Sequence, residues 1–231
     1  SFLDVGWYEC LSNRINTLAI NWLRSRGIEN THILDAGCGE GYYLGRLMTC
    51  LRTQGNECAY HGCGIDISKP AIRMAARRYH DIMWCVANAA DYMPCADGIV
   101  HVALSVFAPR FDALLRRVMA PSGLLLVVLP GPHHLNELNA LAMAHTRDTT
   151  SKESDTVSRF RAHFKLSERH DMSYSMDLDQ DALRDLYRMI PVYWRSTREA
   201  QTRIQALEEL DVTADFVILA FTPAPPSVRP V

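Results

Sequence analysis

Apolar residues recur along this chain with two spacings that alternate. Between residues 7 and 26 they return at steps of three and four, which predicts an amphipathic helix that ends at Gly27. Short runs that suit strands follow at 32–36, 60–65, 82–87, 99–106 and 124–129. Helical spacing returns between several of them, at 43–51, 69–79 and 111–119. Strands and helices that alternate in this way predict a doubly wound α/β fold with a mostly parallel sheet.

The last hundred residues follow the pattern less clearly. We expect a strand near 164–174, a helix over 180–189 and a last strand over 216–221, which would complete a sheet of seven strands. The polar stretch 146–158 has no apolar period and is predicted to be a mobile surface loop. These elements suit one domain over residues 1–231. Within it, 1–27 would form a helical lid that closes over a ligand or simply packs, and the proline-rich 222–231 an extended tail.

The first strand ends in a glycine-rich turn. Asp35 closes the apolar run, and glycines follow at every second position, at 37, 39 and 41, before helical spacing begins. Glycine is needed where a backbone turns at positive φ or lets a ligand lie directly against it, and both needs arise at the carboxyl end of a first parallel strand. The spacing differs from the Gly-x-Gly-x-x-Gly of dinucleotide-binding proteins. The turn therefore predicts a ligand site at this edge that does not follow the dinucleotide-binding pattern.

Two further polar residues end neighbouring strands. Asp66 follows the second strand, 25 residues beyond Gly41, near the spacing that brings the end of strand two beside the glycine turn. A carboxylate there is able to accept both hydroxyls of a ribose. Asn88 ends the third strand in the same way. His101, inside the fourth strand, is expected to be a core histidine.

Composition excludes some classes of function. The chain has 231 residues, of which 48% are hydrophobic, and 24 basic residues against 26 acidic ones, so the net charge shows no strongly basic nucleic-acid footprint. It has no apolar run of membrane-spanning length and no signal-peptide pattern, which favours a cytoplasmic protein. Its seven cysteines form no Cys-x-x-Cys pair, so neither a disulfide framework nor a metal site is predicted.

The run Asp35-x-Gly37-Cys38-Gly39-x-Gly41-Tyr42 resembles motif I of the class I S-adenosylmethionine-dependent methyltransferases, a Rossmann-like family. The resemblance implies S-adenosyl-L-methionine as cofactor and S-adenosyl-L-homocysteine as product, with Asp66 on the ribose and Asn88 near the adenine amine. The implied cofactor-binding residues are Tyr8, Asp35, Gly37, Cys38, Gly39, Gly41, Tyr42, Asp66, Ile67, Asn88, Ala89 and Ser105.

Further motifs narrow the resemblance. Phe2-Leu3-Asp4-x-Gly6-x-Tyr8, Gly64-x-Asp66-x-Ser68-Lys69, Phe107-Ala108-Pro109 and Pro130-Gly131-Pro132-x-His134-Leu135 together resemble the RlmA-type family, over nearly the whole chain. That family methylates the N1 nitrogen of a guanine in a hairpin of large-subunit ribosomal RNA. Its members carry an N-terminal four-cysteine zinc domain, and this chain begins just after the point where such a domain would end.

The acceptor side of the site is less constrained. Phe107, Tyr193 and Trp194 are candidates for stacking an acceptor base, since aromatic stacking is typical of single-stranded RNA recognition. Guanine N1 carries a proton that must leave, and His134 is a candidate general base, although a histidine that only caps or packs fits the same position.

Two other classes of function compete with an rRNA methyltransferase. One is a small-molecule methyltransferase that acts on an aromatic heterocyclic metabolite, which the balanced charge favours. The other is a non-catalytic cofactor-binding module, which is disfavoured because the glycine turn, Asp66 and Asn88 occur together. The oligomeric state stays open, and a homodimer is one option.

Overall fold

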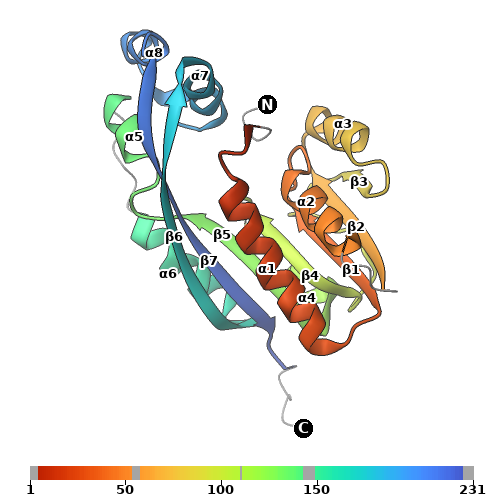
Figure 1. The fold of residues 1–231 in the computed structure, drawn as a ribbon. Helices are drawn as coiled ribbons and strands as arrows, with labels where there is room; N and C mark the ends of the chain where they lie inside the picture. The colour runs from red at the N-terminus through yellow and green to blue at the C-terminus, as the bar shows by residue number, and fades with distance from the viewer. Residues whose placement is uncertain (1–4, 54–57, 110, 143–148, 226–231) are drawn as a thin grey trace. The chain divides into compact units, whose positions relative to one another are not determined.

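The computed structural model describes residues 5–53, 58–109, 111–142 and 149–225 (Figure 1). Its sheet has the strand order β3-β2-β1-β4-β5-β7-β6. The strands are β1 (Asn30–Ala36), β2 (Ala59–Asp66), β3 (Met83–Val86), β4 (Val100–Val106), β5 (Met119–Pro130), β6 (Phe164–Asp179) and β7 (Glu209–Pro223). The doubly wound α/β fold with seven strands is confirmed.

The helices alternate with the strands through the first half of the chain and cluster in the second half. They are α1 (Glu9–Arg26), α2 (Tyr42–Arg52), α3 (Lys69–Arg78), α4 (Asp112–Val118), α5 (Asn136–Leu141), α6 (Thr149–Phe160), α7 (Gln180–Met189), η2 (Tyr193–Arg195) and α8 (Arg198–Gln205). Within these described parts of the chain, no helix combines the length and the apolar character needed to cross a membrane.

Strand pairing sets the position of the candidate residues. β1 pairs in parallel with β2 and with β4, and Asp35 lies opposite Gly64 on one side and Leu104 on the other. β2 and β3 are also parallel, as are β4 and β5. The carboxyl ends of parallel strands meet at one edge of a sheet. Asp35, Asp66 and the end of β4 therefore lie at the same edge.

The described residues form two compact units. The larger unit contains residues 10–128, 155–169 and 218–225, and the smaller unit contains 5–9, 129–142, 149–154 and 170–217. β5, β6 and β7 contribute residues to both.

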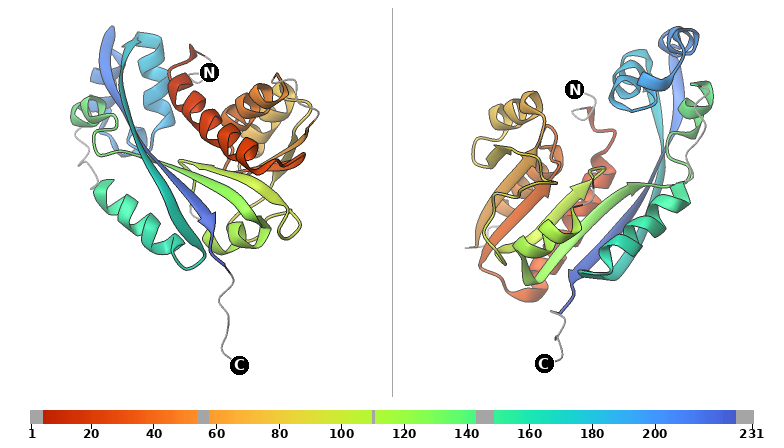
Figure 2. Two further views of the ribbon diagram at one scale, coloured as in Figure 1. Left: turned by 60° about the horizontal axis from the view of Figure 1, so that its bottom comes forward. Right: turned by 180° about the vertical axis from the view of Figure 1, so that it is seen from behind.

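In the larger unit, helices cover both faces of the sheet. α1 and α2 lie over one face and α4 lies over the other (Figures 1 and 2). Leu11 and Ile15 of α1 and Leu44 and Leu47 of α2 have no exposed surface, and they are the residues whose spacing predicted these helices. Burying a side chain of this size contributes about 1.5–3 kcal/mol, so the amphipathic pattern accounts for this layer.

The smaller unit has a core of its own. α7 begins at an N-cap, Asp179, whose side chain accepts a hydrogen bond from the Ala182 N–H at 2.9 Å. Tyr187 of α7 and Ile204 of α8 are fully buried. The predicted helix 180–189 is confirmed, whereas α8 was not predicted.

The prediction of a surface loop over 146–158 was wrong for its described part, since α6 begins at Thr149. The cause is an anchor beyond the end of the polar stretch. Phe160 is fully buried, and its ring centroid lies 5.6 Å from that of Phe164 and 5.2 Å from that of Phe221. Tertiary packing of this kind overrides a weak local pattern. Residues 143–148, and 226–231 of the predicted tail, lie outside the described residues.

Candidate functional site

The three glycines of the turn after β1 are required for different reasons. All have positive φ, 88° at Gly37, 53° at Gly39 and 77° at Gly41. A Cβ at Gly37 would lie 2.5 Å from the Cβ of Ala108, and one at Gly41 would lie 2.4 Å from the Trp84 ring. A Cβ at Gly39 would meet no described atom within 4 Å. Two glycines therefore serve packing, and Gly39 is the point where the backbone lies open to a ligand.

Asp66 fixes this turn and remains able to bind a ligand. Its Oδ2 accepts a hydrogen bond from the Gly39 N–H at 2.9 Å, and its Oδ1 accepts one from the Ser68 N–H at 2.8 Å. Each carboxylate oxygen has a second lone pair, so both remain able to accept a hydroxyl proton. Ser68, in turn, caps α3 by accepting the Ala71 N–H. The carboxylate is thus held in place beside Gly39 before any ligand binds.

Two buried polar side chains beside the turn lack partners. Asp35 and Ser105 are each 1% exposed, and neither the Asp35 carboxylate oxygens nor the Ser105 Oγ has a hydrogen-bond partner within the described chain. Burial, with a smaller contribution from Asp66, raises the pKa of Asp35 to about 7. A buried polar group without a partner is costly. A cationic or hydrogen-bonding ligand at this edge would supply the missing partners.

The other implied cofactor residues of the larger unit surround this edge. Cys38 is buried, and burial, Asp35 and Asp66 raise the pKa of its thiol. Tyr42 opens α2, and its ring packs edge-on against Tyr43. Ile67, next to Asp66, is exposed, and Ala89 is buried. An exposed isoleucine at this position offers an apolar surface to a ligand.

Asn88 forms a turn after β3. Its Nδ2 donates to Asp91 Oδ2 at 2.7 Å, and its Oδ1 accepts from the Ala90 N–H at 3.1 Å. The amide therefore satisfies its own turn in this structure, and a contact with a ligand would have to share or replace these bonds. A sequence pattern shows that an amide is present but not which partners it has.

Phe107 adopts a strained backbone conformation at the end of β4. Its φ is 54°, which is rare for a bulky residue and costs of order 1–3 kcal/mol. Its N–H donates to the Val128 carbonyl at 3.1 Å, and its side chain is 41% exposed. The next residue, Ala108, lies against Gly37. The strained turn therefore lies beside the glycine turn and leaves the Phe107 side chain partly exposed.

His134 belongs to the smaller unit, where it packs against β7. Its Nδ1 accepts the Asp215 N–H at 3.3 Å, and its ring centroid lies 4.9 Å from that of Phe216. Burial, with a smaller contribution from Lys152, lowers the pKa of His134 to about 4. The ring is therefore neutral at pH 7, and with Nδ1 as acceptor its proton lies on Nε2.

Tyr8, implied by resemblance as a cofactor residue, also belongs to the smaller unit. It is buried, and its ring packs edge-on against Phe216 at a centroid distance of 5.4 Å. Burial raises the pKa of its hydroxyl. Within its unit Tyr8 therefore acts as a packing residue. Phe2, Leu3 and Asp4 of the same motif lie outside the described residues.

Trp194 is the most exposed large hydrophobic side chain described, at 80%. Its ring stands edge-on to Tyr193, with centroids 5.1 Å apart, and Tyr193 packs edge-on against the buried Tyr187 at 5.3 Å. The packing of Tyr193 on Tyr187 therefore supports one edge of the tryptophan ring, while most of the ring faces solvent. Three exposed arginines occur in the same stretch of chain, at 188, 195 and 198.

The structure thus divides the predicted site between the units. Asp35, the glycine turn, Asp66, Asn88, Ser105 and Phe107 lie in the larger unit, and Tyr8, His134 and Trp194 lie in the smaller one. Sequence reasoning missed Trp84, whose indole occupies the space left by Gly41 and Gly64. Its signal was weak because it stands in a short strand that reads as core.

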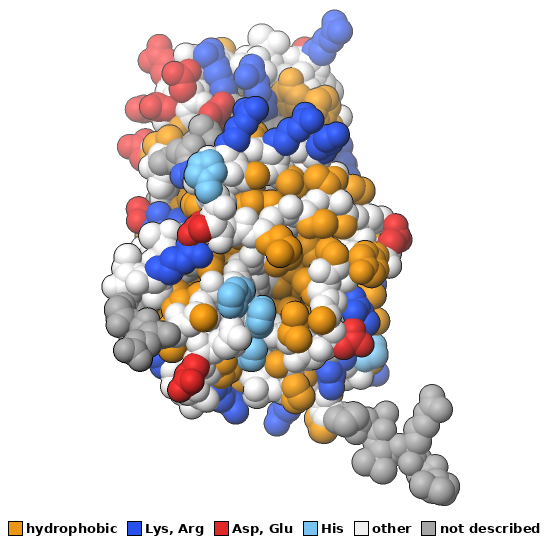
Figure 3. All heavy atoms as spheres, turned by 90° about the vertical axis from the view of Figure 1, so that its right-hand side faces the viewer, with side chains coloured by type: hydrophobic (Ala, Val, Ile, Leu, Met, Phe, Trp, Pro, Cys, Tyr) orange, Lys and Arg blue, Asp and Glu red, His pale blue; other side chains and the backbone are white. Residues whose placement is uncertain are grey.

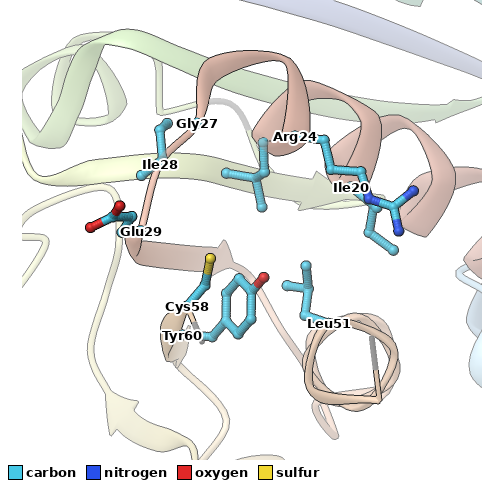
Figure 4. A pocket seen from close by; sticks show the side chains of 9 residues that line it. Ile20, Arg24, Gly27, Ile28, Glu29, Leu51, Cys58 and Tyr60 are labelled. Atoms are coloured by element: carbon cyan, nitrogen blue, oxygen red, sulfur yellow. The ribbon is translucent and has the colours of Figure 1, made fainter. Parts of the chain in front are cut away.

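A cavity of about 300 Å³ lies away from this edge, in the larger unit (Figure 4). It is lined by side chains of α1 and α2 and of residues near the starts of β1 and β2, including Arg24, Glu29 and Tyr60. Parallel strands begin at the edge opposite to the one where they end. This cavity is therefore separate from the glycine turn. Among the residues described, no group of three or more His, Cys, Asp or Glu side chains is placed to hold a metal ion.

Comparison with known proteins gives a consistent result. Residues 33–123 match the family model of the methyltransferase domain. The 23S rRNA (guanine(748)-N(1))-methyltransferase of Streptomyces fradiae is 31% identical, over 94% of this chain and 76% of that protein. A Bacillus subtilis (strain 168) protein that bears the name of a 23S rRNA (guanine-N(1)-)-methyltransferase, YxjB, is 33% identical, over 94% of this chain and 74% of that protein.

A solved structure extends the comparison to the fold. A methyltransferase from Geobacter sulfurreducens, in complex with S-adenosyl-L-homocysteine, superposes with a TM-score of 0.53 at 18% identity. The alignment covers 92% of this chain and 91% of that one. At this identity the likeness concerns the fold alone.

Proposed function

Because this chain belongs to the family of 23S rRNA (guanine-N1)-methyltransferases, we propose that it methylates the N1 nitrogen of a guanine in a hairpin of large-subunit ribosomal RNA. It is an S-adenosyl-L-methionine-dependent methyltransferase, and its second product is S-adenosyl-L-homocysteine. The observation that carries the proposal is the 31% identity to the Streptomyces fradiae enzyme over 94% of this chain.

The larger unit offers the residues that would hold the cofactor. Asp66 would accept the ribose hydroxyls while Gly39 leaves its backbone open beside them. Asp35 and Ser105 would pair with polar groups of the amino-acid end, which satisfies atoms that are otherwise orphaned. Ile67, Asn88 and Ala89 would surround the adenine. When bound, the cofactor supplies an electrophilic methyl group for direct displacement, so the protein acts mainly by orientation, which is worth up to about 7–11 kcal/mol.

Phe107 in the larger unit and Trp194 in the smaller unit are each a candidate for stacking the acceptor base. Both are exposed aromatic side chains, and Phe107 is held beside the glycine turn by Ala108 and Gly37. The exposed arginines 188, 195 and 198 flank Trp194 in sequence and suit contacts with phosphate. A guanine presented unpaired in a loop would stack on such rings.

His134 would take the N1 proton or position the base. The ring is neutral at pH 7, but its pKa of about 4 makes it a weak base. Its basic nitrogen, Nδ1, already accepts the Asp215 N–H, so taking the N1 proton would require that hydrogen bond to break. Its packing on Phe216 and its bond from Asp215 support the positioning role. A His134→Gln variant separates the two: a base gives a loss of turnover that diminishes as pH rises, whereas a positioning residue gives a loss that pH does not change.

A second candidate function is methylation of a small aromatic heterocycle, which the nearly balanced charge of 24 basic and 26 acidic residues favours. Incubation with tritiated cofactor and either unmodified 23S rRNA or a metabolite extract decides between them. We expect label in the RNA, at a single guanine. Label in the metabolite fraction alone would overturn the rRNA proposal and support the second candidate.

A further inference from the structure

A cavity of about 280 Å³ in the larger unit brings two cysteines together. Cys63 belongs to β2, and Cys95 belongs to the segment 87–99 that connects β3 to β4. Both are half-buried, and both line the cavity together with His32, His61 and Met83. Figure 3 shows the face of the molecule that carries β3, where histidine side chains lie among hydrophobic ones. The two thiols therefore share a hollow into which a small molecule fits.

The side chains of Cys63 and Cys95 are hydrogen-bonded to each other, and the pKa values of the two thiols shift in opposite directions. The hydrogen bond between the two side chains raises the pKa of the Cys63 thiol and lowers that of the Cys95 thiol. Arg117 adds to the second effect: its charge favours the Cys95 thiolate, and its Nη1 donates to the Cys95 carbonyl at 3.1 Å. Burial opposes the effects of the hydrogen bond and of Arg117 on Cys95, but the pKa of the Cys95 thiol still lies below its ordinary value.

The other charged and titratable groups around the pair do not supply a competing nucleophile. Asp97 is ion-paired with Arg117 at 2.5 Å. Cys85 and Cys38 contribute to the raised pKa of Cys63, and the pKa of Cys38 is itself raised by burial. Burial and His61 lower the pKa of His32, which is therefore neutral at pH 7. Cys95 is thus the sulfur in this cluster that most favours the thiolate.

We propose that Cys95 is a reactive thiol that peroxides oxidise and that Cys63 resolves into a disulfide. The Cys95 thiolate attacks a peroxide oxygen, so that an S–O bond forms, the O–O bond breaks and hydroxide or alkoxide leaves. The Cys63 sulfur then attacks the Cys95 sulfur. The S–S bond forms, the S–O bond breaks and the Cys63 proton leaves with the hydroxyl as water. Two electrons pass from the sulfur pair to the peroxide.

Such a disulfide would tie the segment 87–99 to β2. Asn88 and Ala89 lie near the start of this segment, and Asp66 ends β2. The oxidised and reduced forms would therefore differ in how freely the residues assigned to the adenine move. The chemistry of the pair itself does not depend on the proposed RNA substrate.

Alkylation tests the reactivity of Cys95. The folded protein is treated with limiting iodoacetamide over a range of pH, and the labelled cysteines are quantified by mass spectrometry after digestion. We expect the alkylation of Cys95 to rise with a midpoint near pH 7, below the ordinary thiol value of about 8.5. This midpoint should move upward in Cys63→Ala, which removes the hydrogen-bond partner. A midpoint at or above the ordinary value would overturn the assignment.

Peroxide treatment tests the disulfide. Trypsin leaves Cys58 and Cys63 on peptide 53–73 and Cys85 and Cys95 on peptide 79–110, so the matched variants Cys58→Ser and Cys85→Ser identify the bonded pair. We expect hydrogen peroxide to join the two peptides in the native chain and in both of these variants. Cys63→Ser should instead leave Cys95 as a sulfenic acid that dimedone traps. A cross-link that persists in Cys63→Ser, or that disappears in Cys58→Ser or Cys85→Ser, would refute the proposal.

Discussion

The glycine turn of the larger unit and the aromatic platform of the smaller unit, formed by Tyr187, Tyr193 and Trp194, are built in opposite ways. The turn combines open backbone at Gly39 with two carboxylates, of which Asp66 is hydrogen-bonded to the Gly39 N–H and Asp35 is buried, at 1% exposed. In the platform, Tyr193 instead packs against the Trp194 ring on one side, and the rest of that ring faces solvent, so that Trp194 is 80% exposed. The first suits a ligand of fixed shape that replaces water completely. The second suits a flexible partner that is recognised by stacking.

The two units also differ in how protons affect them. Burial raises the pKa of Asp35 in the larger unit to about 7, and burial lowers the pKa of His134 in the smaller unit to about 4. Each group is therefore neutral in the ligand-free protein at mildly acidic pH. A rise in pH destabilises the first unit through Asp35, and a fall destabilises the second through His134.

The largest expected effect belongs to Asp35. Its folded pKa lies above its ordinary value of 3.8, so its contribution to stability is complete below that value and is lost as the pH rises to about 7. Between pH 5 and pH 8 we expect the native protein to lose about 3 kcal/mol of stability relative to Asp35→Asn, at 1.36 kcal/mol per pKa unit. Urea unfolding of both proteins at the two pH values measures this.

The raised pKa of Asp35 also predicts that its carboxyl group releases a proton when the cofactor binds. A cationic ligand favours the carboxylate, so at pH 6 nearly one proton should leave the native protein for each cofactor bound, and almost none at pH 8.5. Calorimetry in buffers of different ionisation enthalpy gives this number. Equal release by Asp35→Asn would assign the proton to another group.

The second effect concerns Asp66. Losing charge-assisted hydrogen bonds costs about 1.5–3 kcal/mol, so Asp66→Ala should weaken cofactor binding about 10- to 150-fold. RNA affinity in the absence of cofactor should stay within a factor of two. Asp177→Ala, which removes an exposed carboxylate on β6, is the matched control. Unchanged calorimetric affinity in Asp66→Ala would remove this residue from the site.

His134 has a smaller expected effect on stability, and this effect appears as the pH falls rather than as it rises. Its folded pKa lies below the ordinary 6.5, so its contribution to stability is complete above that value and is lost as the pH falls toward 4. Between pH 7 and pH 5 we expect the native protein to lose about 2 kcal/mol relative to His134→Gln. Hydrogen exchange of α5 and β7 should report the loss first. A loss of hydrogen-exchange protection confined to the larger unit would contradict the assignment of the acid-sensitive group to the smaller unit.

The same contrast explains how much the sequence predicted. The glycine turn and Asp66 were identified because each follows a strand at a spacing that the fold requires, and a local pattern records such a requirement. The left-handed φ of Phe107 was not, because a bulky residue is held there by Val128 and Ala108, which are distant in sequence or carry no signal of their own. α6 was missed because Phe160, not the polar stretch itself, fixes it. Features that depend on local sequence could be predicted from the chain alone. Features that depend on contacts between distant residues could not.

The smallest and most discriminating effect belongs to Trp194. Its ring has a solvent-facing surface and packs edge-on against Tyr193, so truncation removes a stacking surface without opening the core. Base stacking is worth about 1–3 kcal/mol, so Trp194→Ala should lower methyl transfer to RNA about ten- to hundredfold and leave cofactor affinity unchanged. Trp194→Phe, which keeps an aromatic face, should recover most of the activity. Met189→Ala, which removes another exposed apolar side chain, should change it less than twofold. If all three variants lost activity equally, stacking would not be the cause, and exposed apolar area alone would explain the effect of Trp194.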